Sequence, residues 1–130
     1  MKILVIEDNE QNMYLIRFLL ESNGFTAIEA LNGQDGIRLA HEMKPDIILL
    51  DIQLPGMDGY EIAGVIRSSP EIQTIPIIAV TSYAMSGDRE RILAAGATDY
   101  IEKPINPETF IDQIRVHFPQ RRADNESINC

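Results

Sequence analysis

Short apolar runs alternate with longer amphipathic segments along the chain. The runs lie at residues 3–6, 26–28, 47–50, 76–80 and 99–101. In the first, third and fourth run, both faces of an extended chain are apolar, which is typical of strands covered on both sides in a parallel sheet. We therefore expect five short β-strands, three of which are buried.

The segments that follow these runs have the periodicity and the end signals of helices. They cover residues 10–23, 33–44, 59–68, 87–95 and 107–118. Asp58, with Glu61 three positions later, predicts a capping box at the start of the third helix. Asn106 before Pro107 predicts that the last helix begins at residue 107. The repeated alternation predicts an α/β fold: a doubly wound, five-stranded parallel sheet with helices on both faces.

Composition excludes several classes of protein. The chain has 130 residues, the length of one domain, and a net charge of -9 at pH 7. This balance disfavours nucleic acid and anionic membranes as partners, because both are bound by an excess of Lys and Arg. No apolar run approaches the ~18 residues of a membrane span. The single cysteine, Cys130, allows neither an internal disulfide nor a cysteine metal site. We expect a soluble, cytoplasmic protein.

Polar residues gather where four of the predicted strands end. Glu7 and Asp8 follow the first strand, Asp51 follows the third, Thr81 ends the fourth and Lys103 follows the fifth. The carboxyl ends of parallel strands meet at one edge of the sheet, where α/β proteins place their ligand sites. Each residue alone has a structural interpretation, such as a helix cap or a solvated lysine. Their convergence on one edge favours a functional site.

This set of side chains fits phosphoryl transfer to a carboxylate. Clustered carboxylates repel one another and favour a divalent cation, and Mg²⁺ suits them because it prefers oxygen ligands. With the ion held by Glu7, Asp8 and Asp51, the Asp51 carboxylate can attack a phosphoryl group and form an aspartyl phosphate. Lys103 and the Thr81 hydroxyl would bind the phosphoryl oxygens as charge spreads over them.

Three motifs add a family resemblance. Residues 6–9 (IEDN), 51–59 (DIQLPGMDG) and 101–104 (IEKP), in this order and with Thr81 between the last two, resemble the receiver domain of bacterial two-component response regulators, the CheY-like family. The resemblance covers residues 1–118, so we expect one receiver domain followed by a flexible tail at 119–130. Residues 81–85 (TSYAM) further resemble stand-alone DivK-like regulators and the receivers of hybrid histidine kinases.

The resemblance implies a strand order of 2-1-3-4-5 and a phosphoryl-accepting role for Asp51. The donor would be a phosphohistidine on a histidine kinase or a phosphotransfer protein. Thr81 and Lys103 would bind the phosphoryl oxygens, and the Lys103–Pro104 peptide would be cis. The chain would then be a signalling switch rather than an enzyme, with chemistry limited to its own phosphorylation and dephosphorylation.

The resemblance also implies a set of magnesium ligands. Asp8 and Asp51 would bind Mg²⁺ directly, Glu7 would hold it through water, and the backbone carbonyl of Gln53 would complete the protein ligands. Glu7 stands where the family more often has Asp, and its extra methylene group would alter the affinity for Mg²⁺ without removing the site.

Further positions concern output and lifetime. Tyr100 occupies the family's switch aromatic position, and a downstream protein would bind the surface formed by residues 87–118. Gln53 and Tyr83, each two residues beyond a site residue, would modulate the lifetime of the aspartyl phosphate by limiting attack by water.

Other functions are weighed against this one. A haloacid-dehalogenase-like phosphohydrolase also uses an Asp nucleophile, but it wants a second Asp as general acid where this chain has Gln53. A flavodoxin-like electron carrier would need a phosphate-cradling loop after Ile6, where acids would repel the phosphate of FMN. We interpret His41 and His117 as helix residues without an acidic partner. The chain is either a complete regulator, which Met1 favours, or a receiver from a larger protein.

Overall fold

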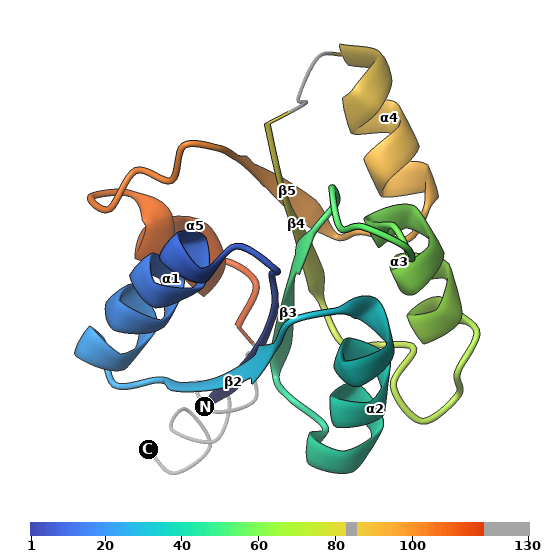
Figure 1. Cartoon of the computed structure of the whole chain (residues 1–130), viewed down its shortest axis with the longest axis horizontal. Coiled ribbons are helices and arrows are strands. Elements are labelled where there is room, and N and C mark those ends of the chain that lie inside the picture. The colour runs from blue at the N-terminus through green and yellow to red at the C-terminus, as the bar shows by residue number, and fades with distance from the viewer. Residues whose placement is uncertain (83–85, 119–130) are drawn as a thin grey trace, which may run out of the picture.

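Five strands and five helices alternate along the chain in the computed structural model, which describes residues 1–82 and 86–118 (Figure 1). The strands are β1 (Lys2–Ile6), β2 (Thr26–Ala30), β3 (Ile47–Asp51), β4 (Ile77–Thr81) and β5 (Asp99–Glu102). The helices are α1 (Glu10–Ser22), α2 (Gly33–Met43), α3 (Gly59–Arg67), α4 (Ser86–Ala94) and α5 (Phe110–Arg115). Each strand and helix predicted from the sequence is present.

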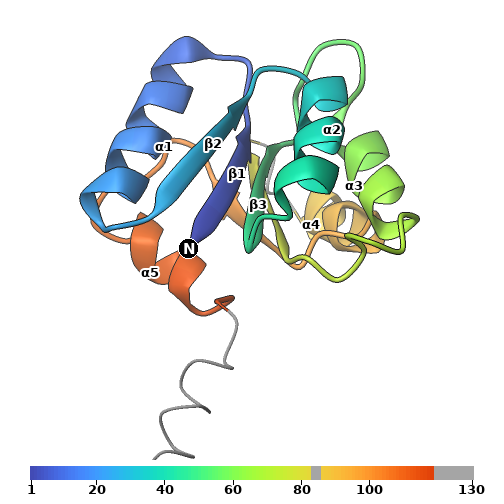
Figure 2. The ribbon, with the colours of Figure 1, turned by 90° about the horizontal axis from the view of Figure 1, so that it is seen from below.

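The strands form one parallel sheet in the order β2-β1-β3-β4-β5. Helices α1 and α5 cover one face of the sheet, and α2, α3 and α4 cover the other (Figures 1 and 2). The predicted doubly wound α/β fold and its strand order are confirmed. The chain leaves β1 toward one face and β3 toward the other, so the carboxyl ends of these neighbouring strands form the switch point at which such sheets place ligands.

Alternate strand residues face two hydrophobic cores. The core under α2, α3 and α4 contains Leu4, Ile6, Ile48, Leu50, Ala79, Ile62, Ile66 and Ile92. The core under α1 and α5 contains Ile3, Val5, Ile47, Leu49, Val80, Ile16, Leu20, Phe110 and Ile114. Each of the larger side chains among them (Val, Leu, Ile and Phe) contributes about 1.5–3 kcal/mol when fully buried. All residues of β3 and β4 are buried. The packed strands therefore hold the polar residues at their ends in fixed positions.

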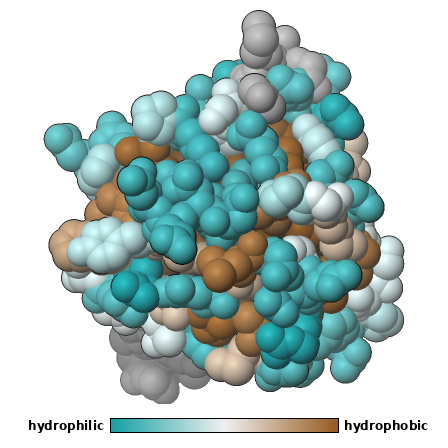
Figure 3. All heavy atoms as spheres, in the orientation of Figure 1, coloured by the Kyte–Doolittle hydropathy of each residue, from teal (hydrophilic) through white to brown (hydrophobic). Residues whose placement is uncertain are grey.

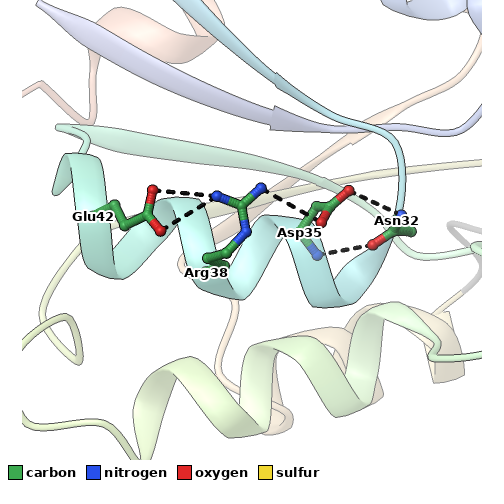
Figure 4. A network of polar contacts seen from close by, with 4 residues as sticks. All are labelled: Asn32, Asp35, Arg38 and Glu42. Atoms are coloured by element: carbon green, nitrogen blue, oxygen red, sulfur yellow. Dashed lines mark hydrogen bonds and ion pairs between the residues drawn. The ribbon is translucent and has the colours of Figure 1, made fainter.

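Polar contacts fix the start and the exposed side of α2 (Figure 4). The Asn32 side chain caps this helix by accepting a hydrogen bond from Asp35 N at 2.8 Å. The Arg38 guanidinium lies 3.5 Å from Asp35 and 3.2 Å from Glu42, one turn away on either side. Exposed pairs at this spacing contribute about 0.3–0.5 kcal/mol each, so packing against the sheet is the main force that holds α2 in place.

The last helix is shorter than predicted. It covers Phe110–Arg115 rather than residues 107–118. Residues 107–109 form a turn in which Thr109 N donates to the Asn106 carbonyl at 3.1 Å, only three residues back. Tight turns of this kind are common at helix ends and fall outside the α-helical range. Asn106 therefore begins the turn before the helix rather than the helix itself.

Strand β2 is longer than the predicted run of 26–28 and continues to Ala30. It lies at the edge of the sheet, where Glu29 stays exposed and its carboxylate pairs with Arg17 at 2.6 Å. A charged residue at an edge interrupts the apolar pattern without interrupting the backbone pairing with β1. The predicted tail at 119–130 and the predicted modulating residue Tyr83 lie outside the described residues.

Polar groups dominate one face of the molecule. Hydrophilic side chains cover most of the face shown in Figure 3, with scattered hydrophobic residues between them. Among the described residues, no helix combines the length and the apolar character that crossing a membrane requires.

Candidate functional site

Three acids meet at the carboxyl edge of the sheet, as the sequence predicts. One carboxylate oxygen from each of Glu7, Asp8 and Asp51 lies within 4.8 Å of the others. Glu7 and Asp51 are buried, with 1% and 3% of their surface exposed, whereas Asp8 is exposed. The first two acids follow β1 and the third ends β3, so adjacent parallel strands bring them together.

Lys103 follows β5, the edge strand beyond β4, and its side chain reaches this cluster along the same edge of the sheet. Its ammonium nitrogen Nζ lies 3.3 Å from Glu7 Oε1 and 3.4 Å from Asp51 Oδ2. The Lys103–Pro104 peptide is cis, as expected. Lys103 N also donates to the Thr81 carbonyl at 2.8 Å. Thr81 is completely buried at the end of β4. The structure therefore places the predicted nucleophile, hydroxyl and ammonium around the same sheet edge.

Within the cluster, Glu7 has a strongly raised pKa. Burial and the neighbouring Asp51 charge raise the pKa of Glu7 from 4.5 to about 7, against the opposing effects of an Asn9 backbone hydrogen bond and Lys103. The Asn9 bond is a donation from its backbone N to Glu7 Oε2 at 3.1 Å. The positive charge of Lys103 thus only partly offsets the effects of burial and of Asp51 on the pKa of Glu7.

The donor set fits a hard divalent cation. Glu7 Oε1 is buried and has no hydrogen-bond partner within the described part of the chain, although the Lys103 ammonium is near it. Leaving a buried carboxylate oxygen without a hydrogen bond is costly. A cation that prefers oxygen ligands would satisfy this atom and reduce the repulsion between the acids. The carboxylates present are therefore suited to Mg²⁺.

The backbone N–H and the side chain of Gln53 also form hydrogen bonds at the site, in addition to the role predicted for its backbone carbonyl. Its backbone N donates to Asp51 Oδ1 at 2.9 Å. Its side-chain oxygen Oε1 accepts from Ser82 N at 3.2 Å. Sequence reasoning missed this side-chain bond, because the two residues lie in separate loops and only the strand register brings them together.

Tyr100 lies half-buried on β5, next to the strand that ends in Thr81. It pairs with Ala79 across the sheet and packs against the core under α2, α3 and α4. The Arg89 guanidinium of α4 lies 5.4 Å from the centre of the Tyr100 ring and 3.7 Å from the Glu102 carboxylate. The predicted switch residue thus connects β5 with α4, a contact that the sequence did not indicate.

Both histidines have acidic neighbours, so our interpretation of them was wrong. His117 Nε2 lies 2.7 Å from Asp99 Oδ2, and His41 Nδ1 lies 3.6 Å from Glu71 Oε1. Each acid lies in a different part of the chain from its histidine, which is why the helix pattern alone did not reveal the pairs. Neither histidine is part of the cluster at the sheet edge.

This fold and this acidic site define a class of protein. Residues 3–115 match the family model described as the response regulator receiver domain. The chain therefore belongs to the response regulator receiver family, whose members act in two-component signalling. Membership sets aside the phosphohydrolase and the electron carrier.

Individual relatives agree with this assignment. The chain is 45% identical over 113 residues to the polar-differentiation response regulator DivK of Brucella anthropi, which covers 87% of this chain and 92% of DivK. The chemotaxis protein CheY4 of Vibrio cholerae has a TM-score of 0.86 at 25% identity, covering 90% of this chain and 98% of that one.

A third relative is the receiver domain of a sensor histidine kinase from Pseudomonas aeruginosa. It is 37% identical with a TM-score of 0.79, covering 92% of this chain and 94% of that one. Its structure has a magnesium ion coordinated in the active site cleft. The predicted resemblance to DivK-like regulators and to kinase receivers is confirmed.

Proposed function

We propose that this receiver is a phosphorylation-dependent switch in which Asp51 accepts a phosphoryl group. The donor is a phosphohistidine on a histidine kinase or a phosphotransfer protein. An oxygen of the Asp51 carboxylate forms a bond to phosphorus while the bond from phosphorus to the imidazole nitrogen breaks, and that nitrogen keeps the electron pair. The observation that carries the proposal is the Asp51 carboxylate, buried at the switch point with the Lys103 ammonium 3.4 Å away.

The neighbouring residues divide the remaining work. Lys103 and the Thr81 hydroxyl bind the phosphoryl oxygens as negative charge spreads over them. Glu7, Asp8, Asp51 and the Gln53 carbonyl hold Mg²⁺, which when bound supplies positive charge to the same oxygens. The 4.8 Å grouping of the three acids and the unsatisfied Glu7 oxygen support this ligand set.

The output surface is formed by residues 87–118. A groove of about 740 Å³ between β5 and α5 lies within it, and its lining includes Tyr100, Glu102, Asp112 and Val116. We propose that a downstream protein binds this surface when Tyr100 changes its rotamer. The net charge of -9 supports a protein partner rather than nucleic acid or an anionic membrane.

The proposed chemistry stays within the chain. It comprises phosphorylation of Asp51 and hydrolysis of the resulting acyl phosphate, without turnover of a separate substrate. Gln53 and Tyr83 limit the access of water to the acyl phosphate. We place this switch in the cytoplasm, with residues 1–118 as the receiver domain.

Acetyl phosphate, a small phosphoryl donor, tests the acceptor directly. We expect intact-mass measurement to show one added phosphoryl group on the wild-type protein in the presence of Mg²⁺ and none in excess chelator. Asp51→Asn keeps the shape of the side chain but removes the nucleophilic charge, so it should not be labelled. Asp112→Asn, which changes an exposed acid on α5, is the matched control and should be labelled normally. Labelling of Asp51→Asn at the wild-type rate would place the acceptor elsewhere.

A further inference from the structure

The hydrogen-bond ladder between β3 and β4 ends in a contact made by a side chain. Ile52 N donates to the Val80 carbonyl at 3.2 Å. In a regular parallel ladder the next bond would run from Ser82 N to the Ile52 carbonyl. That carbonyl instead accepts from Gly59 N, at 3.1 Å, where α3 begins. Ser82 N donates to Gln53 Oε1 at 3.2 Å, so the glutamine side chain takes the place of the missing acceptor.

This contact connects Gln53 to two parts of the site. Its backbone N bonds the Asp51 carboxylate at 2.9 Å, and its side chain holds the peptide N–H that directly follows Thr81. On the β5 side, the Thr81 carbonyl accepts from Lys103 N at 2.8 Å. The end of β4 is therefore fixed between the loop that follows Asp51 and the loop that carries Lys103.

We propose that Gln53 is a positioning residue that holds Thr81 in its unphosphorylated place through the bond from Ser82 N to Gln53 Oε1. The inference rests on the proposed function, in which the Thr81 hydroxyl binds a phosphoryl group on Asp51. Movement of Thr81 toward that group carries the adjoining peptide away from Gln53. The bond stabilises only the unphosphorylated arrangement, so its loss favours the other state. One neutral hydrogen bond corresponds to a roughly 2- to 10-fold change in such an equilibrium.

The substitution Gln53→Met tests this role. Methionine keeps the length of the side chain and the backbone carbonyl but lacks the amide oxygen. Gln34→Met makes the same change at an exposed position on α2 and is the matched control. By NMR, we expect the Ser82 amide hydrogen of the unphosphorylated protein to exchange roughly 2- to 10-fold faster in Gln53→Met than in either the wild type or Gln34→Met.

The second measurement is the affinity for beryllofluoride, a mimic of the phosphoryl group, in the presence of Mg²⁺. We expect Gln53→Met to bind it roughly 2- to 10-fold more tightly than the wild type. Each protein is measured at a Mg²⁺ concentration that saturates it, because the Gln53 backbone carbonyl is also a proposed ligand of the ion. This comparison separates an effect on Thr81 from an effect on the ion.

The outcomes separate the two proposals. Unchanged exchange at Ser82 overturns the inferred hydrogen bond, and faster exchange with unchanged or weaker beryllofluoride binding overturns the positioning role. A wild-type protein that binds no beryllofluoride contradicts the proposed function instead, while exchange at Ser82 still decides whether Gln53 holds this segment.

Discussion

The protonation of one buried acid makes the stability of the metal-free protein depend on pH. The pKa of Glu7 is raised to about 7 by burial and by Asp51, whereas its ordinary value is 4.5. The folded state therefore binds this proton more tightly than the unfolded chain does. The stability that this group contributes is complete below about pH 4.5 and is lost as pH rises through about 7. The loss is on the order of 3 kcal/mol.

We expect urea unfolding in excess chelator to show this fall in the free energy of unfolding between the two pH values. Glu7→Gln, which cannot ionise, should reduce the slope, and Glu108→Gln at an exposed site should leave it intact. An identical slope in Glu7→Gln would mean that other groups cause the pH dependence.

The exposed acid Asp8 should contribute to the ion site without supporting the fold. Asp8→Asn relieves repulsion with the two buried acids, so we expect its stability in chelator to stay level or rise. Its affinity for Mg²⁺ should fall. For the wild type, Mg²⁺ at a hundred times its dissociation constant should add about 2.7 kcal/mol of stability, and the same concentration should add less for the variant. A loss of stability in chelator would identify Asp8 as a structural residue.

Single residues also show what the sequence could predict about the site. Glu7, Asp8, Asp51, Thr81 and Lys103 could be found because the carboxyl ends of parallel strands must meet, whatever the rotamers are. The bond from Ser82 to Gln53, the contact of Arg89 with Tyr100 and the pair of His117 with Asp99 depend on side-chain conformations across separate elements. No local pattern in the sequence encodes them.

At the scale of elements, a capping box at Asp58 and Glu61 begins α3, the helix that follows the loop after Asp51. Glu61 N donates to Asp58 Oδ1 at 2.9 Å, and Asp58 N donates to Glu61 Oε1 at 3.3 Å. Asp58→Ala removes the cap and should lower the free energy of unfolding by about 1 kcal/mol. Asp58→Asn keeps an accepting oxygen and should change the free energy of unfolding by only about a few tenths of a kcal/mol. Urea unfolding of both variants measures these changes. Equal losses of stability in Asp58→Ala and Asp58→Asn would show that the charge of Asp58, rather than its capping hydrogen bond, stabilises α3.

Element ends were predictable where the signal is local. Asn32 and Asp58 are each followed by a helix at the next residue, since a cap needs only its own first turn. Asn106 looks the same in the sequence, but its side chain accepts from Glu108 N, two residues on, whereas Asn32 and Asp58 each accept from the third residue on. The chain then makes a tight turn before α5 begins at Phe110, and the residue type at position 106 does not distinguish this turn from a helix start.

At the scale of the whole molecule, the site and the proposed output surface are linked across two strands. Tyr100 pairs with Ala79, two residues before Thr81 on the same face of β4. Beyond Tyr100, the Arg89 guanidinium lies 5.4 Å from the ring centre and connects it to α4. A displacement of Thr81 can therefore reach α4 through a single aromatic side chain.

Tyr100→Ala tests this link. Acetyl phosphate should label the variant at nearly the wild-type rate, because Tyr100 packs against the core and Arg89 rather than against the acids. Beryllofluoride should change the amide hydrogen exchange of Ile92 in α4 of the wild type, and this change should be largely lost in the variant. A phosphoryl group can shift the equilibrium only by its different affinity for the two rotamer states, and the variant has no such rotamers. Tyr14→Ala on the opposite face of the sheet is the control and should respond like the wild type. An equal response in Tyr100→Ala would mean that the signal leaves the site through another part of the molecule.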